Sequence, residues 1–405
     1  MELQKEDVAL KRNWKNLIGP LIIVVILAIV IISGIRSGDL IGAIRAIRAA
    51  NPWYLVACGL CYLAYVLFDA LGIRSALRSA GYTLSIPKAV KVTVTGEFYS
   101  NITPGASGGQ PMQIYHLHKN HVPAGIATSA LMTHFIAFRV MLTVLMTVLG
   151  IANFTFIQAQ VGNAMPLLII GYVYNALMVA VVILLCITAK PVKWAIDKLV
   201  CIVEKLHLTK NAQAVREKLF ATVETFYKSM GHLSRHKAEI IRQLLFTGLQ
   251  LISLMMVLVF VFHGLGLVGA NPVQLITMGL AQYITTSYVP MPGASGAQEG
   301  VFSLFFSKLF PGSSCFAGMM LWRFMTYYLC LIIGTFSLVL SALTERHKAR
   351  AIEKTKHEQI LSKLHQAKEE LKTAGAERAL ELRETISRLE EALEVSNCTK
   401  QISAC

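Results

Sequence analysis

The sequence predicts an all-α polytopic membrane protein with about six full spans and two re-entrant helical hairpins in inverted repeats. Three observations lead to this prediction. Charged residues make up 15% of the 405 residues, against about 25% in soluble domains, and they gather between long uncharged stretches. The octapeptide Thr-Pro-Gly-Ala-Ser-Gly-Gly-Gln at 103–110 returns at 291–298 as Met-Pro-Gly-Ala-Ser-Gly-Ala-Gln. Both copies carry helix-breaking Pro and Gly in apolar surroundings.

The repeated octapeptide points to a functional site. Broken backbone at membrane depth is tolerated only where it is buried in protein or lines a watery cavity. Paired interruptions at matching places in two halves are typical of transporter substrate sites. We therefore expect each octapeptide to form a hairpin tip, and the two tips to meet near the bilayer midplane in one cavity. The tip residues are Pro104, Gly105, Gly108, Gly109, Pro292, Gly293 and Gly296.

Residues 1–50 predict an N-terminal span and an interfacial helix. Lys and Arg precede an uncharged run from Asn16 to Ile35, which is long enough to cross about 30 Å of hydrocarbon. Residues 36–50 place apolar side chains on one helical face, as a helix at the membrane surface does. The basic residues before the first span predict a cytoplasmic N-terminus.

The first repeat is predicted to cover residues 51–189. Its uncharged stretches predict full spans at about 51–73, 122–150 and 165–189. The segment 92–118 is too short for two crossings, so a re-entrant hairpin with the first octapeptide at its tip fits better.

Residues 190–242 predict a cytoplasmic amphipathic linker. They hold eleven Lys and Arg against five Asp and Glu, a net charge of +6. Apolar residues recur at helical spacing, so we expect the linker to lie along the cytoplasmic membrane surface.

The second repeat is predicted to cover residues 243–344, with full spans at about 243–267 and 315–343. Between them, residues 272–310 form the second hairpin around the second octapeptide. The positive-inside rule predicts that this unit has the opposite orientation in the membrane to the first. Inverted repeats of this kind are typical of alternating-access transport.

The tail 345–405 predicts a cytoplasmic charged helix with twelve basic and eleven acidic residues. Leu382, Ile386, Leu389 and Leu393 follow the spacing of a short coiled-coil seam. A solvated helix and an element for homodimerisation both agree with this pattern.

Composition also excludes several classes of function. The net charge of +15 lies mainly beside apolar spans, and no nucleic-acid-binding signature accompanies it, so we expect no nucleic-acid partner. No metal-ligand spacing, phosphate-binding loop or nucleophile motif occurs, which predicts no metal, no cofactor and no catalytic residue. Of the eight cysteines, Cys58 and Cys61 form a C-x-x-C inside an apolar span, where they suit apolar packing, and the others are scattered, so no disulfide is required.

Four charged residues within apolar segments are the candidates for function, namely Glu97, Arg139, Glu299 and Arg323. Such residues are costly in a membrane and usually mark function or pairing. In one interpretation they form two Glu–Arg pairs that lock each hairpin to the next span. In the other, the arginines bind a lipid phosphate and the acids receive a cationic head group or a coupling proton. The remaining candidates for lipid binding are the polar residues at or beside the tips: Asn101, Ser107, Gln110, Ser295 and Gln298.

The segments around both octapeptides resemble the lysylphosphatidylglycerol synthase transmembrane region. The resemblance rests on Gly96 to Asn101 with the first tip, Tyr115 and Arg139, and on Pro292 to Gly300 with Arg323. It covers about residues 15–345 and implies a flippase that moves aminoacylated phosphatidylglycerol between leaflets. Full-length members of the family add a soluble aminoacyltransferase domain. The roughly 60 residues after residue 345 are too few for such a domain, so we expect no lysyl transfer by this chain alone.

The function expected from these observations is flippase-like translocation or binding of a phospholipid or lipid-linked head group in the cell membrane. Gln110 stands where many relatives carry an acid, which leaves the lipid open. Two alternatives remain: lipid aminoacylation together with a separate synthase, or an accessory role in a lipid-modifying complex. The partners implied are a membrane phospholipid with an anionic head group, a soluble aminoacyltransferase or glycosyltransferase, and a second copy bound through the tail.

Overall fold

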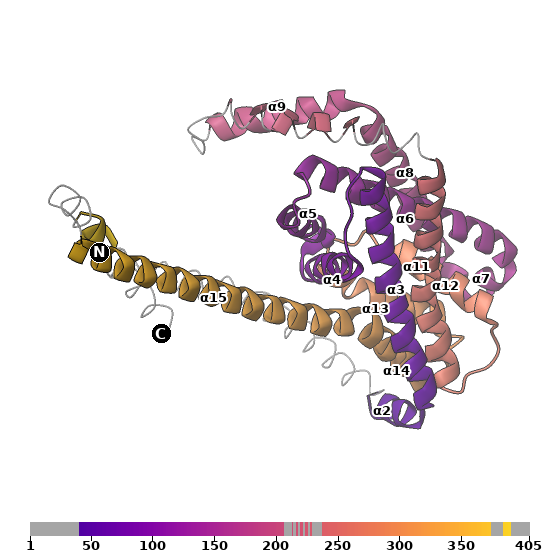
Figure 1. Ribbon diagram of the computed structural model, residues 1–405. Helices are drawn as coiled ribbons and strands as arrows, with labels where there is room; N and C mark the ends of the chain where they lie inside the picture. Colours follow the sequence, from indigo (N-terminus) through magenta and orange to yellow (C-terminus); the bar gives the residue numbers. More distant parts are fainter. Residues whose placement is uncertain are drawn as a thin grey trace. The chain divides into compact units, whose positions relative to one another are not determined.

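The computed structural model describes residues 40–205, 237–373 and 384–389, together with residues 213, 216, 217, 219–221, 223–225, 227 and 228 (Figure 1). All regular structure in these residues is helical. The chain divides into one unit that ends at Thr335 and a second that begins at Phe336.

Five helical segments of the described chain are long and apolar enough to cross a membrane. They are Pro52–Ser79, Ala124–Ala152, Phe154–Leu185, Ala238–Gly264 and Ser313–Ser341. The prediction of an all-α polytopic membrane protein is therefore confirmed. Each segment overlaps a span expected from the sequence, and the sixth expected span, at 16–35, lies outside the described residues.

Helices α3 (Pro52–Ser79) and α11 (Lys237–Gly264) form a central antiparallel pair (Figure 1). The N–H of Asn51 donates to the carbonyl of Gly264 at one end, and the hydroxyl of Ser75 donates to Glu239 at the other. Asn51 also caps α3 with its side chain, and Pro52 follows at the first helical position, where its missing N–H costs nothing.

The outer face of α3 is an exposed apolar stripe. Its members recur every three or four residues and include Trp53, Val56, Leu60, Leu63 and Leu67. The opposite face is buried against α11, so the helix presents one side to protein and the other to its surroundings. An apolar stripe of this kind suits contact with lipid chains.

Each octapeptide forms the turn of a helical hairpin. The first hairpin consists of α4 (Ile86–Ile102), the short turn η1 (Pro104–Ala106) and α5 (Gly109–Lys119). The second consists of α12 (Pro272–Thr286), η3 (Pro292–Ala294) and α13 (Ala297–Phe306). In both halves a long helix precedes the hairpin and another helix follows it, and the two preceding helices are the antiparallel α3 and α11.

The other helices precede, connect or follow these two hairpins in the chain. Helix α2 (Leu40–Ala49) packs on α14 (Ser313–Arg323). Helix α6 (Ala124–Ala152) follows the first hairpin, and α7 (Phe154–Val161), η2 (Gly162–Ala164) and α8 (Met165–Ile187) come next. A π-helical turn, η4 (Phe324–Tyr328), joins α14 to α15 (Leu329–Thr373).

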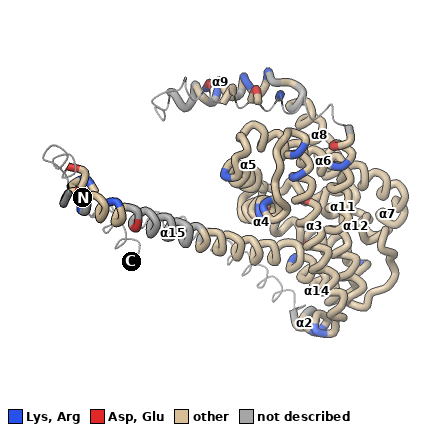
Figure 2. Tube along the Cα trace, in the orientation of Figure 1, with Lys and Arg blue, Asp and Glu red and all other residues tan. Residues whose placement is uncertain are grey.

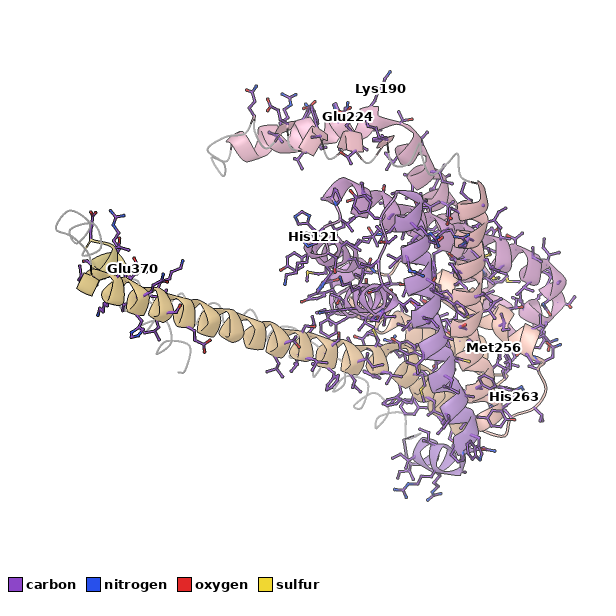
Figure 3. The ribbon with its side chains drawn as sticks, viewed as in Figure 1. His121, Lys190, Glu224, Met256, His263 and Glu370 are labelled. Atoms are coloured by element: carbon purple, nitrogen blue, oxygen red, sulfur yellow. The ribbon has the colours of Figure 1, made fainter. Side chains whose placement is uncertain are left out.

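Charged residues gather outside the membrane-spanning segments. Figure 2 shows Lys and Arg on α2 and along α9 (Ala189–Lys205), where the basic linker was expected. Lys190 and Glu224 of this region extend their side chains away from the helices (Figure 3).

In the second unit, Ile386 is buried against Leu364 and Ala367 of α15, so part of the expected seam packs within the chain. Leu382 and Leu393 lie outside the described residues.

Candidate functional site

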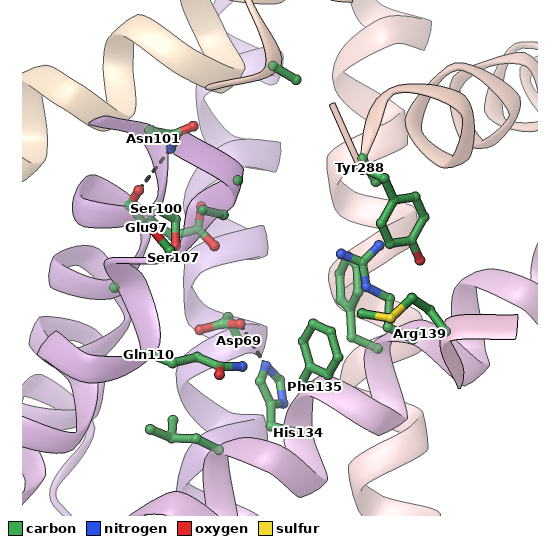
Figure 4. A pocket seen from close by; sticks show the side chains of 18 of the residues that line it. Asp69, Glu97, Ser100, Asn101, Ser107, Gln110, His134, Phe135, Arg139 and Tyr288 are labelled. Carbon is green, nitrogen blue, oxygen red and sulfur yellow. Dashed lines mark hydrogen bonds and ion pairs between the residues drawn. The ribbon is translucent and has the colours of Figure 1, made fainter. Parts of the chain in front are cut away.

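A cavity of about 930 Å³ lies where the two hairpin tips come together. Turns η1 and η3 contact each other, and residues of both octapeptides line the cavity. Figure 4 looks into it, with Arg139 and Tyr288 on one side and Asp69, Glu97 and the first tip on the other. The charged side chains of the two walls thus have opposite sign.

The two tips share an unusual backbone conformation. Gly105 and Gly293 have φ angles of 61° and 56°, and the alanines that follow them, Ala106 and Ala294, have 56° and 49°. This left-handed region is unfavourable for any residue with a Cβ, so an alanine there stores strain. The same strained pair in both copies indicates that the tip geometry itself is required.

Each guanidinium nitrogen of Arg323 donates a hydrogen bond within the second tip. Its Nε donates to Glu299 at 2.7 Å, Nη1 donates to the carbonyl of Gly293 at 3.1 Å, and Nη2 donates to Ser295 at 3.0 Å. The other carboxylate oxygen of Glu299 accepts the N–H of Gly296 at 2.6 Å. The π-helical turn places Tyr327 beneath this cluster, with its ring centroid 4.4 Å from the Arg323 guanidinium. Arg323 is 4% exposed, so its charge is compensated inside the protein.

Arg139 has a different environment. Its Nε and Nη1 are buried and have no hydrogen-bond partner in the part of the chain that the structure describes. Aromatic rings surround the guanidinium carbon instead, with centroids 4.9 Å away for Tyr288, 5.2 Å for Phe135 and 5.9 Å for Phe138. Tyr288 is itself fixed because its hydroxyl donates to the buried side chain of Asn175. The cavity wall therefore holds an arginine with two unused donor atoms.

The comparisons with known proteins agree with the resemblance seen in the sequence. Residues 16–334 match the profile of the lysylphosphatidylglycerol synthase transmembrane region. The chain belongs to this family. It is also 22% identical over 270 residues to a UPF0104 membrane protein of Pyrococcus horikoshii, a match that covers 65% of this chain and 79% of that protein.

In this member of the lysylphosphatidylglycerol synthase transmembrane family, most of the residues singled out by sequence line the cavity. They are Glu97, Asn101, Gly105, Ser107, Gln110, Gly293, Gln298 and Arg323, together with Arg139. Ser295 and Glu299 lie behind them as partners of Arg323. Gly109 faces the other leg of its hairpin, where a Cβ would overlap Ser100, so its role there is close packing.

Of the two Glu–Arg pairs expected in one interpretation as structural locks, the structure contains one. Glu299 pairs with Arg323, but Glu97 accepts a hydrogen bond from the hydroxyl of Tyr65 at 2.8 Å and not from Arg139. The reason is visible in the sequence. At the spacing of 188 residues that separates the octapeptides, Arg139 corresponds to Tyr327 and Arg323 to Phe135. The two arginines therefore occupy positions that differ by four residues, about one helical turn, when the two units are aligned.

A polar cluster beside the cavity was missed by the sequence reasoning. Asp69 of α3 pairs with His134 of α6, and Gln250 of α11 donates to the same carboxylate. All three line the cavity of this family member. The signal that could have found them is the presence of ionisable residues within apolar spans. No group of three or more His, Cys, Asp and Glu suited to a metal ion occurs in the described segments.

One wall of the cavity is apolar. Helix α8 contributes a stripe of side chains at helical spacing, which continues onto the linker region; it consists of Met178, Val182, Leu185, Val192 and Val223. The cavity of this family member therefore combines a charged end at the hairpin tips with an apolar side.

Proposed function

We propose that the chain is a flippase-like protein that binds the head group of a phospholipid in the cavity between its hairpin tips and moves it between leaflets. Arg139 carries the proposal. Its Nε and Nη1 are buried and have no hydrogen-bonding partner among the described residues, which is costly in a membrane, and a phosphate oxygen supplies the acceptors that they lack.

The shape of the cavity supports a lipid rather than a soluble anion. A phospholipid has a charged head and apolar chains, which correspond to the arginine end and to the α8 wall. The volume of about 930 Å³ lies within the range of about 300–1,000 Å³ that is usual for small-molecule sites. Glu97, which lies opposite Arg139, would suit a head group that also carries an amine, as an aminoacylated lipid does.

The arrangement of the hairpins supports movement of the lipid. Two hairpins with strained tips contact each other, and the long helices that precede them run antiparallel. Inverted repeats with discontinuous helices are the architecture in which one unit rocks against the other around a central site.

Replacement of Arg139 tests the proposal. Arg139→Gln should slow the transfer of fluorescent phosphatidylglycerol across reconstituted vesicles by at least about tenfold, because each charge-assisted hydrogen bond contributes about 1.5–3 kcal/mol. Arg139→Lys should recover only part of the rate, since Lys lacks the planar fork of donors. Arg45→Gln, at an exposed site on α2, is the matched control. Transfer by Arg139→Gln at the rate of the control would overturn the proposal.

A further inference from the structure

A buried carboxylate–imidazole pair forms part of the cavity wall. Asp69 Oδ1 lies 2.7 Å from His134 Nε2, and the two side chains are 9% and 10% exposed. Figure 4 shows the pair between the first hairpin and Phe135. Neither residue belongs to the two octapeptides, and the pair is a second polar feature of the cavity beside Arg139.

Donors surround the carboxylate of Asp69. Thr93 donates to Oδ2 at 2.6 Å, and Gln250 donates to Oδ1 at 2.8 Å. With His134, three side chains from three other helices meet at one carboxylate. Thr93 belongs to the hairpin leg α4, so the pair connects the hairpin to the central helices α3 and α11.

The second nitrogen of His134 has a partner suited to either protonation state. Gln243 Nε2 lies 2.6 Å from Nδ1, as a neutral imidazole that accepts at Nδ1 requires. The Oε1 of the same amide is buried and without a partner within the described segments. Turning the amide over brings Oε1 to Nδ1, where it accepts the N–H of a protonated ring. The site can therefore bind or release a proton at Nδ1 without losing a hydrogen bond.

Other titratable and charged groups lie near the pair, and some of them could bind the proton in place of His134. They are Tyr65 on α3, Glu97 on α4, Arg139 on α6, Tyr283 on α12, and Glu239 on α11, which accepts a hydrogen bond from Ser75. Glu239 also pairs with Arg242. Among these groups Glu97 is the competing proton acceptor inside the cavity, so any test must separate it from His134.

Protonation changes the charge that an entering lipid meets. An ionised Asp69 beside a neutral His134 carries a net charge of −1, and a proton taken from water at Nδ1 makes the pair neutral. An anionic head group is then repelled less, and by linkage its binding favours the protonated ring.

We propose that Asp69 and His134 form a proton-binding site whose protonation is coupled to occupancy of the cavity by an anionic phospholipid head group. This inference rests on the proposed function and adds the proton as a second ligand. Gln243 is the residue that accommodates both states of the ring.

Lipid binding as a function of pH tests the coupling. The full chain in phosphatidylcholine nanodiscs is titrated with fluorescent phosphatidylglycerol between about pH 5.5 and about pH 7.5, which brackets the usual range of histidine. Binding by the natural protein should tighten as the pH falls, by up to about tenfold per pH unit. His134→Gln keeps a donor for Asp69 and should abolish this slope. Glu97→Gln should retain it, as should His263→Gln at the far end of α11 (Figure 3).

A measurement on the natural protein covers the case in which His134→Gln fails to fold. In weak buffer near pH 6.5, saturating phosphatidylglycerol should cause the uptake of up to about one proton per bound lipid. Binding without proton uptake, or a pH slope that survives His134→Gln or disappears in Glu97→Gln, would overturn the proton site. Binding that depends on Arg139 but not on pH would leave the proposed function intact. If lipid binding did not depend on Arg139 at all, both the proton site and the proposed function would be overturned.

Discussion

At the scale of single residues, the two arginines that line the cavity differ in whether their nitrogen atoms have hydrogen-bond partners. Arg323 donates to a carboxylate, a carbonyl and a hydroxyl, all of them in the second hairpin. Arg139 has aromatic neighbours and two unused donor atoms. An arginine whose three nitrogens all have partners within the protein stabilises the fold, whereas one with unused donors in a cavity is prepared for a ligand.

Replacing Arg323 should therefore affect stability first. Arg323→Gln leaves Glu299 buried without its charged partner and should lower the free energy of unfolding by on the order of 3–5 kcal/mol. Glu299→Gln in the same chain should recover much of this loss. Chemical unfolding in detergent measures both variants, with Arg139→Gln as the control that should unfold like the natural protein. An Arg323→Gln variant as stable as this control would show that the pair contributes little.

At the scale of elements, the hairpin tips were the part best predicted by sequence. Two Pro-Gly-Ala turns in apolar surroundings predicted two breaks, and the structure has them at η1 and η3, in contact with each other. Proline and glycine act through local sterics, which the sequence reveals directly. The Arg139 environment could not be predicted, because it depends on Tyr288 and Asn175 from distant helices. The Asp69–His134 pair likewise joins residues 65 positions apart.

The tips offer a matched pair of glycine substitutions. Gly105→Ala faces open space and should cost only the left-handed backbone penalty, about 1–2 kcal/mol. Gly293→Ala carries the same backbone penalty, and its new methyl group would also overlap the ring of Tyr327. It should be clearly more destabilising, and Tyr327→Ala in the same chain should reduce the difference. Thermal unfolding in detergent compares the variants; equal losses at both glycines would mean that Tyr327 does not pack on the second tip.

At the scale of the whole molecule, the chain is an all-α membrane protein of the lysylphosphatidylglycerol synthase transmembrane family whose two octapeptides enclose one cavity. Hydropathy predicted the spans well because a membrane helix must satisfy its own backbone hydrogen bonds. The cytoplasmic placement of the linker and of both termini stays a prediction from the distribution of Lys and Arg. The central claim is that a lipid head group enters the cavity at Arg139.

Photo-crosslinking of a lipid head group tests this claim most directly. Phosphatidylglycerol with a diazirine on its head group is irradiated with the protein in nanodiscs, and the modified peptides are identified by mass spectrometry. We expect adducts on the first tip, 103–110, and on α6 around Phe135 and Arg139, and we expect Arg139→Gln but not Arg45→Gln to remove them. Adducts confined to the exposed stripe of α3 from Trp53 to Leu67, and unchanged by Arg139→Gln, would contradict the account.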